Sequence, residues 1–514
     1  MGSMVAIMPP RQARLQQLVQ AAPFGGINRE VPEWRIEDND FQDIANFLSN
    51  ERDLRTRPEP AFTAISDQAI NGQVDGYDID GDRHFLVATR TKAYGFIGTN
   101  WTQLTGTLTA TDLNLYTGTS LQGRILFANG VDKIKNWDGL AAAFTDLDAT
   151  APIARYITTF GNRVMTGFTV EGGVPFPQRI RWPADGDPTD WTGFGSGFVD
   201  LLEGTDPLTG LTVVGNRLSA FFPERIILGA RTFDALNPFT FENYSKEGVG
   251  NICPYSLATW GNICCFVGRD DIYMFDTQIH QRIGNKARKA ILYDVLQGNL
   301  DLVVGGIPDA TAGRDFLTYW LAMPNGAVWV FDFNTQSWTR QYFTGKKVTS
   351  IGRFKSLHGV RIIDLVGTIA QQNWVINLTG VQISVDNLTL GFSNGNIGEI
   401  DYSLPIADTW LVGPSKEFDY GGVGWNKTVK RLQFVYRDFG VGTATLTLTN
   451  EFGQTQTLSG SFGLNGSGRV RNKIFDFTLS GNRIKWELTG NFPIAIQEIV
   501  HNYFQRGPLL SRQA

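Results

Sequence analysis

The chain has 514 residues, with 45 Lys and Arg against 50 Asp and Glu, and a formal net charge of −5. This length exceeds what one hydrophobic core organises and predicts two to four domains. The acidic balance argues against a general nucleic-acid-binding protein, whose affinity would come from phosphate neutralisation. The 57 glycines, 35 phenylalanines and 13 tryptophans favour many short strands joined by glycine turns, so we predict an all-β protein.

The three cysteines are Cys253, Cys264 and Cys265. An odd number, with two of them adjacent, disfavours a disulfide framework or a zinc site and favours assembly in a reducing compartment. The sequence has no apolar run of transmembrane length and no signal-peptide core near its beginning. We therefore expect a soluble protein made in the cytoplasm.

Residues 1–58 are expected to form an N-terminal arm with short helices. Leu15, Leu18, Val19 and Ala22 follow the i, i+3, i+4, i+7 spacing of one helix face. A second set with helical spacing contains Phe41, Ile44, Ala45 and Leu48. We expect each apolar stripe to pack on its own chain, or on a neighbouring domain or subunit.

Residues 59–345 repeat one pattern six times. Each repeat has an apolar run, assigned to an inner strand, and a second run that ends near a bulky side chain. The apolar runs span residues 85–90, 125–129, 164–168, 218–222, 263–268 and 316–323. The bulky side chains are Phe96, Trp137, Trp182, Leu228, Phe275 and Phe331, at intervals of 41, 45, 46, 47 and 56 residues. A period of about 48 residues is typical of four-stranded blades and predicts a six-bladed β-propeller.

A recurring turn supports the repeat. Gly161-Asn162, Gly215-Asn216 and Gly261-Asn262 each stand between two apolar runs, as in a tight hairpin, whose turn needs residues that tolerate positive φ. The turn alone is weak evidence, because Gly481-Asn482 lies outside the repeats. Between the fifth and sixth repeats, residues 285–296 predict a short helix with Lys286, Arg288 and Lys289 on a solvated side.

The remaining chain divides into two parts. Residues 346–405 are either a connector or an extra β repeat, and the sequence leaves both alternatives open. Residues 406–514 alternate apolar and polar side chains, as in Ala444, Leu446 and Leu448, so we predict a C-terminal β-sandwich. Phe477 and Trp486 are expected in its core. The same alternation occurs at Leu432, Phe434 and Tyr436, at Phe475 and Leu479, and at Ile484 and Leu488.

We predict no catalytic, cofactor-binding or metal-binding residues, and no enzyme. The histidines, His84, His280, His358 and His501, are neither beside a nucleophile nor spaced as a metal pair. Asp75, Asp78, Asp80 and Asp82 crowd one turn, which leaves calcium binding open beside ordinary turn chemistry. The segment 185–191 is similar to the Asp-box turn of sialidases, but it lacks the leading Ser and occurs once, so two carboxylates flanking a sugar bond are not supported.

Several segments resemble one family. They are Arg181-Trp182, Gly186-Asp187-Pro188-Thr189-Asp190-Trp191, Gly215-Asn216-Arg217-Leu218, Glu224-Arg225-Ile226, Gly248, Gly250, Pro254, Ser256, Gly261, Phe266, Asp271-Ile272 and Phe275. Together they are similar to the central region of tail nozzle proteins of short-tailed bacteriophages, also called tail tubular protein B or packaged-DNA stabilisation proteins. Residues 23–27, 45–46 and 54–58 resemble the family's opening, with Glu59 and Pro60 where a glycine is usual, and 493–507 resemble its closing strand. The match covers roughly half the chain.

The resemblance implies a structural virion protein that forms a hexameric nozzle through which DNA is retained and then ejected. Its partners would be the portal and adaptor proteins, tail fibres, tailspikes or a tail needle, and genomic double-stranded DNA that passes without specific binding. Six copies would carry a formal charge of 6 × −5 = −30, which suits a wall that repels phosphate. We expect the basic side chains of Lys346, Lys347, Arg353 and Lys355 to point toward partners or solvent, away from the DNA.

Two alternatives remain. A carbohydrate- or receptor-binding propeller of a virion would use aromatic platforms such as Trp101, Trp191, Trp320 and Trp338. A propeller glycoside hydrolase is the weaker alternative, because it needs convergent carboxylates in the central channel and no pair stands out.

Overall fold

The computed structural model describes residues 15–505, except 99, 203, 233, 235–236, 245–247, 309–316, 355–386, 401–405, 421–426, 464–465 and 467. Lys355, His358 and the start of the sixth apolar run therefore lie outside the described residues. The chain divides into two compact units. Unit 1 comprises Met1–Arg57, Ser337–Arg340 and Pro405–Ala514, and unit 2 comprises Pro58–Gln336 and Gln341–Leu404.

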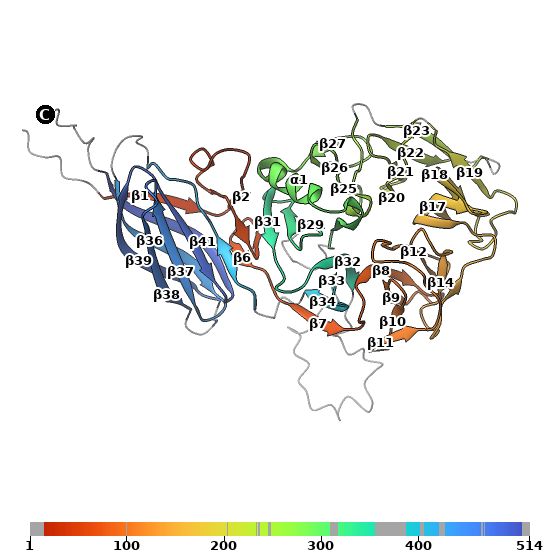
Figure 1. The fold of residues 1–514 in the computed structure, drawn as a ribbon, viewed down its shortest axis with the longest axis horizontal. Helices are drawn as coiled ribbons and strands as arrows, with labels where there is room; N and C mark the ends of the chain where they lie inside the picture. The colour runs from red at the N-terminus through yellow and green to blue at the C-terminus, as the bar shows by residue number, and fades with distance from the viewer. Residues whose placement is uncertain are drawn as a thin grey trace, which may run out of the picture. The chain divides into compact units, whose positions relative to one another are not determined.

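Unit 2 is a β-propeller, and all six predicted repeats form antiparallel sheets in it (Figure 1). The first blade contains β8 (Ile70–Tyr77), β9 (Arg83–Thr89), β10 (Ala93–Ile97) and β11 (Asn100–Leu104). The second blade contains β12 (Thr117–Leu121), β13 (Arg124–Ala128), β14 (Lys135–Trp137) and β15 (Thr145–Asp146). The third blade contains β16 (Ile153–Phe160), β17 (Arg163–Glu171), β18 (Val174–Trp182) and β19 (Gly197–Asp200). The fourth blade contains β20 (Gly210–Val214), β21 (Arg217–Phe221), β22 (Ile226–Arg231) and β23 (Phe239–Asn243). The fifth blade contains β24 (Ala258–Trp260), β25 (Ile263–Val267), β26 (Ile272–Phe275) and β27 (His280–Arg282). The sixth blade contains β28 (Val304–Gly306), β29 (Thr318–Ala322) and β30 (Val328–Asp332).

The segment after the sixth repeat makes a further sheet. It supplies β32 (Val348–Phe354), β33 (Asn387–Phe392) and β34 (Asn396–Ile400), and β34 pairs with β7 (Pro60–Ala64) from the start of the unit. The first strands of successive sheets contact one another around the ring, which closes between β32 and β8. The segment left open as connector or β repeat is thus a blade, and β7 fastens the two ends of the propeller chain together.

The apolar runs assigned to inner strands are in fact the second strands of their sheets. Residues 85–89 lie in β9 and 263–267 in β25, and these stretches are buried almost throughout because other blades cover both faces. The innermost strands are instead β8, β12, β16, β20, β24, β28 and β32. They are more polar or richer in glycine, since one side of each faces the middle of the ring. Apolar content therefore marks the second strand of each blade, which has a strand on either side, and does not identify the innermost strand.

Bulky side chains fill the spaces between blades. Trp137 of the second blade is 1% exposed and packs with Leu86, Leu104 and Phe144 in one cluster. It reaches over Gly95 of the first blade, where an added Cβ would lie 2.5 Å from its ring carbon Cζ2. Glycine at position 95 is therefore what lets the indole lie against the neighbouring sheet.

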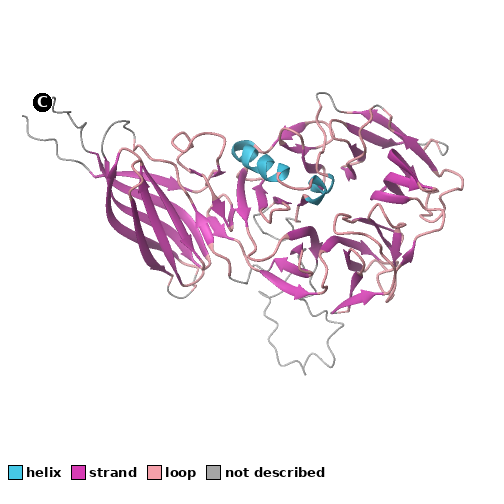
Figure 2. Cartoon of the chain, viewed as in Figure 1, coloured by secondary structure: helices cyan, strands magenta, loops and turns pink. Residues whose placement is uncertain are grey.

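The predicted turns and the helix are present. Each Gly-Asn turn joins a first strand to a second strand, with Phe160 opposite Arg163, Val214 opposite Arg217 and Trp260 opposite Ile263. Helical structure among the described residues is confined to short segments, η1 (Pro254–Ser256), η2 (Asn285–Ala287), α1 (Arg288–Leu296) and η3 (Leu300–Leu302) (Figure 2). The segment α1 confirms the helix expected between the fifth and sixth repeats.

Unit 1 is a β-sandwich. One sheet has the order β39-β36-β41-β6-β5 with β1 on β41, and the other contains β31-β4-β35-β40-β37-β38. The strands are β1 (Leu15–Ala21), β4 (Ile44–Ala45), β5 (Phe47–Ser49), β6 (Leu54–Thr56), β31 (Ser337–Gln341), β35 (Trp410–Val412), β36 (Lys427–Asp438), β37 (Gly442–Asn450), β38 (Thr455–Phe462), β39 (Val470–Gly481), β40 (Ile484–Gly490) and β41 (Ile494–Gln505). A parallel pair, β2 (Gly26–Ile27) and β3 (Asp40–Phe41), belongs to the same unit.

The prediction of short helices in the arm is wrong. Residues 15–57 contain strands and no helix, and β1 pairs along β41 from Leu15 opposite Phe504 to Ala21 opposite Glu498. Tertiary pairing overrides the helical spacing here, because the edge of β41 supplies backbone partners that a short isolated helix lacks. Phe41, Ile44 and Leu48 are buried as expected, although strands carry them. The arm is therefore part of the sandwich.

The sandwich core follows the alternation in the sequence. Leu432, Phe434 and Tyr436 are buried from one sheet, and Ala444, Leu446 and Leu448 are buried from the other. Phe434 packs edge-on against Trp486 across the two sheets, with ring centroids 5.6 Å apart. Trp486 is 1% exposed and Phe477 is 7% exposed, which confirms that both lie in the core.

Candidate functional site: the central cavity of the propeller

A cavity of about 330 Å³ lies among the innermost strands of the propeller. Four blades line it, through β8, β24, β28 and β32; of these strands, β8 and β32 are labelled in Figure 1. The lining residues are Gln73, Asp75, Ala258, Thr259, Gly305, Gly306, Ile307, Ile351, Gly352 and Arg353. Three of these are glycines, and two carry a formal charge. A polar cavity of this size at the centre of a fold is a candidate binding site.

Arg353 is the cation of this cavity, and neighbouring blades hold it in place. Its Nε donates to the carbonyl oxygen of Ile307 at 3.1 Å, and its Nη2 donates to the carbonyl oxygen of Thr259 at 3.1 Å. Ile307 directly follows β28 and Thr259 lies on β24, whereas Arg353 lies on β32. The guanidinium is therefore fixed by main-chain atoms that cannot rotate away.

Asp75 and Gln73 line the cavity from β8. Asp75 Oδ2 accepts a hydrogen bond from Arg83 Nε at 3.0 Å, so the charge of this carboxylate is balanced on its own sheet. Gln73 Nε2 donates to Ser350 Oγ at 3.1 Å, and Gln73 Oε1 accepts from Thr389 Oγ1 at 2.7 Å. These contacts connect the first blade to the last. Arg353 is then the one charged lining residue that the first blade does not neutralise.

Side chains from opposite blades also bridge the ring. Arg155 of β16 pairs with Asp301 of η3, with 2.9 Å between Nη2 and Oδ1, and its guanidinium lies 5.7 Å from the ring centre of Tyr255. The Tyr255 hydroxyl donates to the carbonyl oxygen of Leu115, which precedes β12, at 3.1 Å. Burial raises the pKa of Tyr156 and of Tyr255, so both phenols stay neutral. The middle of the propeller is therefore crossed by side chains.

The aspartate turn in the first blade is a closed hydrogen-bond arrangement. Asp78 Oδ1 accepts from the backbone N–H groups of Asp80 and Asp82 at 3.0 and 2.8 Å, and its Oδ2 lies 2.8 Å from His84 Nε2. The hydrogen bond with His84 lowers the pKa of Asp78. This geometry is ordinary turn chemistry. Within the described ranges, no group of three or more His, Cys, Asp or Glu residues is placed to hold a metal ion.

The segment 185–191 also forms a self-contained turn. Asp187 Oδ1 accepts from the backbone N–H of Thr189 at 2.9 Å, and Asp190 Oδ1 accepts from the backbone N–H of Gly193 at 2.7 Å. Trp191 is 2% exposed, and its carbonyl oxygen accepts from Arg181 Nη2 at 3.2 Å. These carboxylates organise a turn and do not line the central cavity.

The basic residues singled out from the sequence do not form one surface. Arg353 lines the cavity, contrary to the expectation that it points toward partners or solvent. Lys346 Nζ lies 4.2 Å from the ring centre of Phe62, and Lys347 is exposed. On the helix segment, Lys289 is exposed, whereas Lys286 and Arg288 are half-buried. The sequence does not show that β32 is an innermost strand and that Arg353 lines the cavity.

The aromatic platforms of the carbohydrate alternative are mostly inaccessible. Trp191, Trp320 and Trp338 are 2%, 3% and 1% exposed, and Trp101 packs edge-on against Phe96 with ring centroids 5.3 Å apart. These side chains fill spaces between strands, so the expectation that they form sugar platforms is wrong for the three buried ones. The hydrolase alternative finds one carboxylate, that of Asp75, among the lining residues of the cavity.

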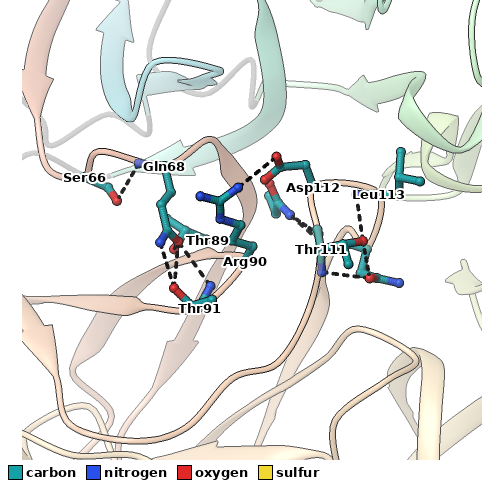
Figure 3. A network of polar contacts seen from close by, with 10 residues as sticks. Ser66, Gln68, Thr89, Arg90, Thr91, Thr111, Asp112 and Leu113 are labelled. Carbon is teal, nitrogen blue, oxygen red and sulfur yellow. Dashed lines mark hydrogen bonds and ion pairs between the residues drawn. The ribbon is translucent and has the colours of Figure 1, made fainter.

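A polar network beside the first blade is satisfied within itself (Figure 3). Gln68 Oε1 accepts from Thr89 Oγ1 at 2.8 Å and from Thr91 Oγ1 at 3.0 Å, and Arg90 Nη1 pairs with Asp112 Oδ2 at 3.3 Å. The network joins the segment before β8 to the β9–β10 turn and to the connection that leads to β12. It fixes loops of the first blade in position.

Large apolar side chains are exposed in the third blade. Phe194, Phe198 and Leu202 are 74%, 54% and 74% exposed, before, within and after the outer strand β19. The Arg179 guanidinium is stacked between the rings of Phe176 and Phe198, 3.7 and 3.8 Å from their centres. Arg179 also pairs with Asp200. An ordered aromatic surface of this kind is typical of a protein contact.

The three cysteines are free and buried. Burial raises the pKa of each thiol, so the thiols stay protonated and unreactive at neutral pH.

Among the described residues, no helix is long and apolar enough to cross a membrane.

Comparisons with known proteins give neither a family nor a function. No family model and no curated protein matches the chain. Similar solved structures include BamB from Moraxella catarrhalis, at 13% identity over 75% of this chain and 97% of that chain, with a TM-score of 0.35. YCF48 bound to D1 peptide matches at 12% identity over 67% and 97%, with a TM-score of 0.38. BBS1N in complex with ARL6DN matches at 9% identity over 67% and 97%, with a TM-score of 0.40. The protein contains a β-propeller and a β-sandwich.

Proposed function

We propose that the chain is a structural protein of a bacteriophage tail, made in the host cytoplasm and assembled into the virion. Six copies form the nozzle through which DNA is retained and then ejected, in contact with portal and adaptor proteins and with tail fibres, tailspikes or a tail needle. The proposal assigns no catalytic role to any residue.

The observation that carries the proposal is the set of residues that resemble tail nozzle proteins between 181 and 275. In the third blade, Trp182 and Trp191 are buried and Gly186 has a φ of +73°. Gly250, at the start of the fifth blade, allows so close an approach that an added Cβ would lie 2.1 Å from the carbonyl oxygen of Phe222. The resemblance therefore falls on positions that determine the shape of the blades, as expected for a structural protein.

The interior of the propeller bears on where DNA could pass. Arg155 with Asp301, and Tyr255 with Leu115, span the ring from opposite blades. The passage of the proposed nozzle would then lie between copies. A formal charge of 6 × −5 = −30 on six copies favours a wall that repels phosphate and lets DNA slide.

The exposed aromatic side chains of the third blade supply a candidate contact between copies. Phe194 and Phe198 would each bury a large apolar surface in an interface, and aromatic residues dominate the energetics of protein contacts. The outer strand β19 carries Phe198 and ends the sheet order, so one of its edges is open for pairing.

Particle mass tests the proposal. Six chains of 56.9 kDa would give about 341 kDa by mass photometry, and negative-stain images should show rings with sixfold symmetry. Replacing Phe194 and Phe198 together with serine should reduce the hexamer fraction, whereas Phe452→Ser, at a residue of unit 1 that is 74% exposed, serves as the matched control. A chain that remains monomeric alone and together with portal and adaptor proteins contradicts the proposal.

A further inference from the structure

We propose that the central cavity of the propeller binds a small molecule that carries a carboxylate group, and that Arg353 receives this group. The site lies within one copy and does not depend on the assembly proposed above. It would be a ligand site in the interior of a structural protein.

Arg353 has donors left for a ligand. A guanidinium has five N–H donors in a planar fork, and the two hydrogen bonds of Arg353 to main-chain carbonyls use one donor on Nε and one on Nη2. Across the described residues, no carboxylate forms an ion pair with it. A planar carboxylate matches the remaining fork because two parallel N–H···O bonds can form at once. The two main-chain acceptors hold the fork in position before a ligand arrives, which reduces the ordering cost of binding.

The charge of the lining favours an anion with a single charge. Arg353 and Asp75 are the charged lining residues, and Arg83 already neutralises Asp75. The cavity therefore carries about one net positive charge. A carboxylate balances this charge, whereas a phosphate dianion would require further cations that the lining does not supply. The aspartate on β8 also disfavours a second anionic group on that side.

The shape of the cavity comes from close approach of the innermost strands. An added Cβ on Gly352 would lie 2.5 Å from Gln73 Oε1, and an added Cβ on Gly306 would lie 2.3 Å from Ile351 Cγ2. Glycine at these positions lets β8, β28 and β32 come together, so that Arg353 and Thr259 line one space. About 330 Å³ lies at the lower end of small-molecule pockets, so the ligand has the size of a metabolite.

The hydrogen-bonding groups around Arg353 complete the site. An innermost strand pairs on one edge only, so β24, β28 and β32 present backbone N–H and C=O groups toward the middle of the ring. The hydroxyl group of Thr259 also lines the cavity. Such groups can hold the uncharged part of a ligand that bears hydroxyl or amide groups. A small hydroxy acid or a sugar acid fits this combination of chemistry.

Titration of the full-length protein with defined probes tests the site. The probes are acetate, glutamate and glucuronate, with inorganic phosphate and glucose for comparison, followed by saturation-transfer NMR and calorimetry. At least one carboxylate should bind with a Kd below about 1 mM and raise the melting temperature, and glucose should not bind. Phosphate that binds more tightly than every carboxylate, or carboxylates with no Kd below that limit, would overturn the proposal.

Two variants and one control locate the binding. Arg353→Gln should weaken carboxylate binding at least tenfold, and Thr259→Phe should do the same by filling the cavity while its main-chain carbonyl remains. Arg282→Gln, at an exposed arginine paired with Asp270, should bind as the wild type does. If Arg353→Gln does not fold, Thr259→Phe decides. Unchanged binding in the folded cavity variants would place the ligand elsewhere and refute the site.

Discussion

Arg57 and Asp408 form a buried ion pair, with 2.8 Å between Nη2 and Oδ2, although 351 residues separate them in the chain. The Arg57 side chain is fully buried and the Asp408 side chain is 11% exposed. The pair joins the last residue of the first segment of unit 1 to the segment that precedes β35 in the same unit. Unit 1 is thus held together by this ion pair as well as by the pairing of β1 with β41, both of which connect early and late parts of the chain.

We expect Asp408→Asn to destabilise unit 1 by about 3 to 5 kcal/mol, because it removes a negative charge that lies 2.8 Å from the buried guanidinium. Chemical denaturation followed by tryptophan fluorescence measures the change. Asp476→Asn, which breaks the exposed pair of Asp476 with Arg431, is the control and should leave the midpoint nearly unchanged. Equal effects of the two substitutions would show that the buried pair has no special role.

Trp486→Ala should cost about 3 to 5 kcal/mol through loss of a large apolar side chain and the cavity that remains. The indole packs against Phe41, Phe434 and His501, so its removal affects both sheets of the sandwich. Phe452→Ala, at an exposed residue, is the control. A loss below 1 kcal/mol for Trp486→Ala in denaturant titrations would mean that this site collapses without leaving a cavity.

His501 should make the sandwich sensitive to acid. Its side chain is fully buried between Gln20, at 2.9 Å from Nε2, and Tyr420, at 3.0 Å from Nδ1. Burial lowers the pKa of His501 to about 3, below the usual value near 6.5 that applies to the unfolded chain. Between these two values the unfolded state binds more protons than the folded state, so the free energy of unfolding falls as the pH falls.

The expected loss is up to about 1.4 kcal/mol per pH unit below pH 6.5, with full stability above it. Unfolding measured from pH 7.5 to pH 4 should show this slope in the wild type. A His501→Gln variant should lose much of it, and His280→Gln, at a half-buried histidine in the propeller, should keep it. If His501→Gln retains the wild-type slope, another group is responsible.

The sequence was most informative where burial imposes a simple period. The alternation of Ala444, Leu446 and Leu448 correctly predicted a strand with one buried face, and the aromatic spacing correctly predicted repeated blades. The helix predicted at Leu15, Leu18 and Val19 is wrong because apolar residues in a stretch of eight can fit a helical spacing by chance, and only the partner strand β41 distinguishes the two structures. Pairing over almost 490 positions leaves no local trace in a single sequence.

The cavity was hidden for a related reason. The sequence marks Arg353 as a basic residue, but Gln73, Thr259 and Gly306 have no distinctive spacing relative to it. Their proximity depends on the closure of the ring between β32 and β8, which brings the first and last blades together. The strand β7, which closes the last blade, likewise comes from the beginning of the unit. A sequence motif is recognisable when its residues lie close together in the chain, whereas the residues of this cavity come from four separate segments.

The last prediction concerns DNA. If six copies surround the genome, the surface toward it should be acidic or neutral, because a ring of lysines and arginines would trap DNA through counterion release. The purified protein should therefore not retard double-stranded DNA at about 0.15 M salt in gel-shift assays. Lys346 and Lys347 provide the test, because they are consecutive basic residues of the propeller. Lys347 is exposed, and the Lys346 ammonium group lies over the ring of Phe62. Retardation at that salt concentration that disappears in Lys346→Gln with Lys347→Gln, but persists in Lys430→Gln of unit 1, would mean that the propeller grips the genome. DNA would then be retained by direct binding to this lysine pair, and a wall that only guides it would be excluded.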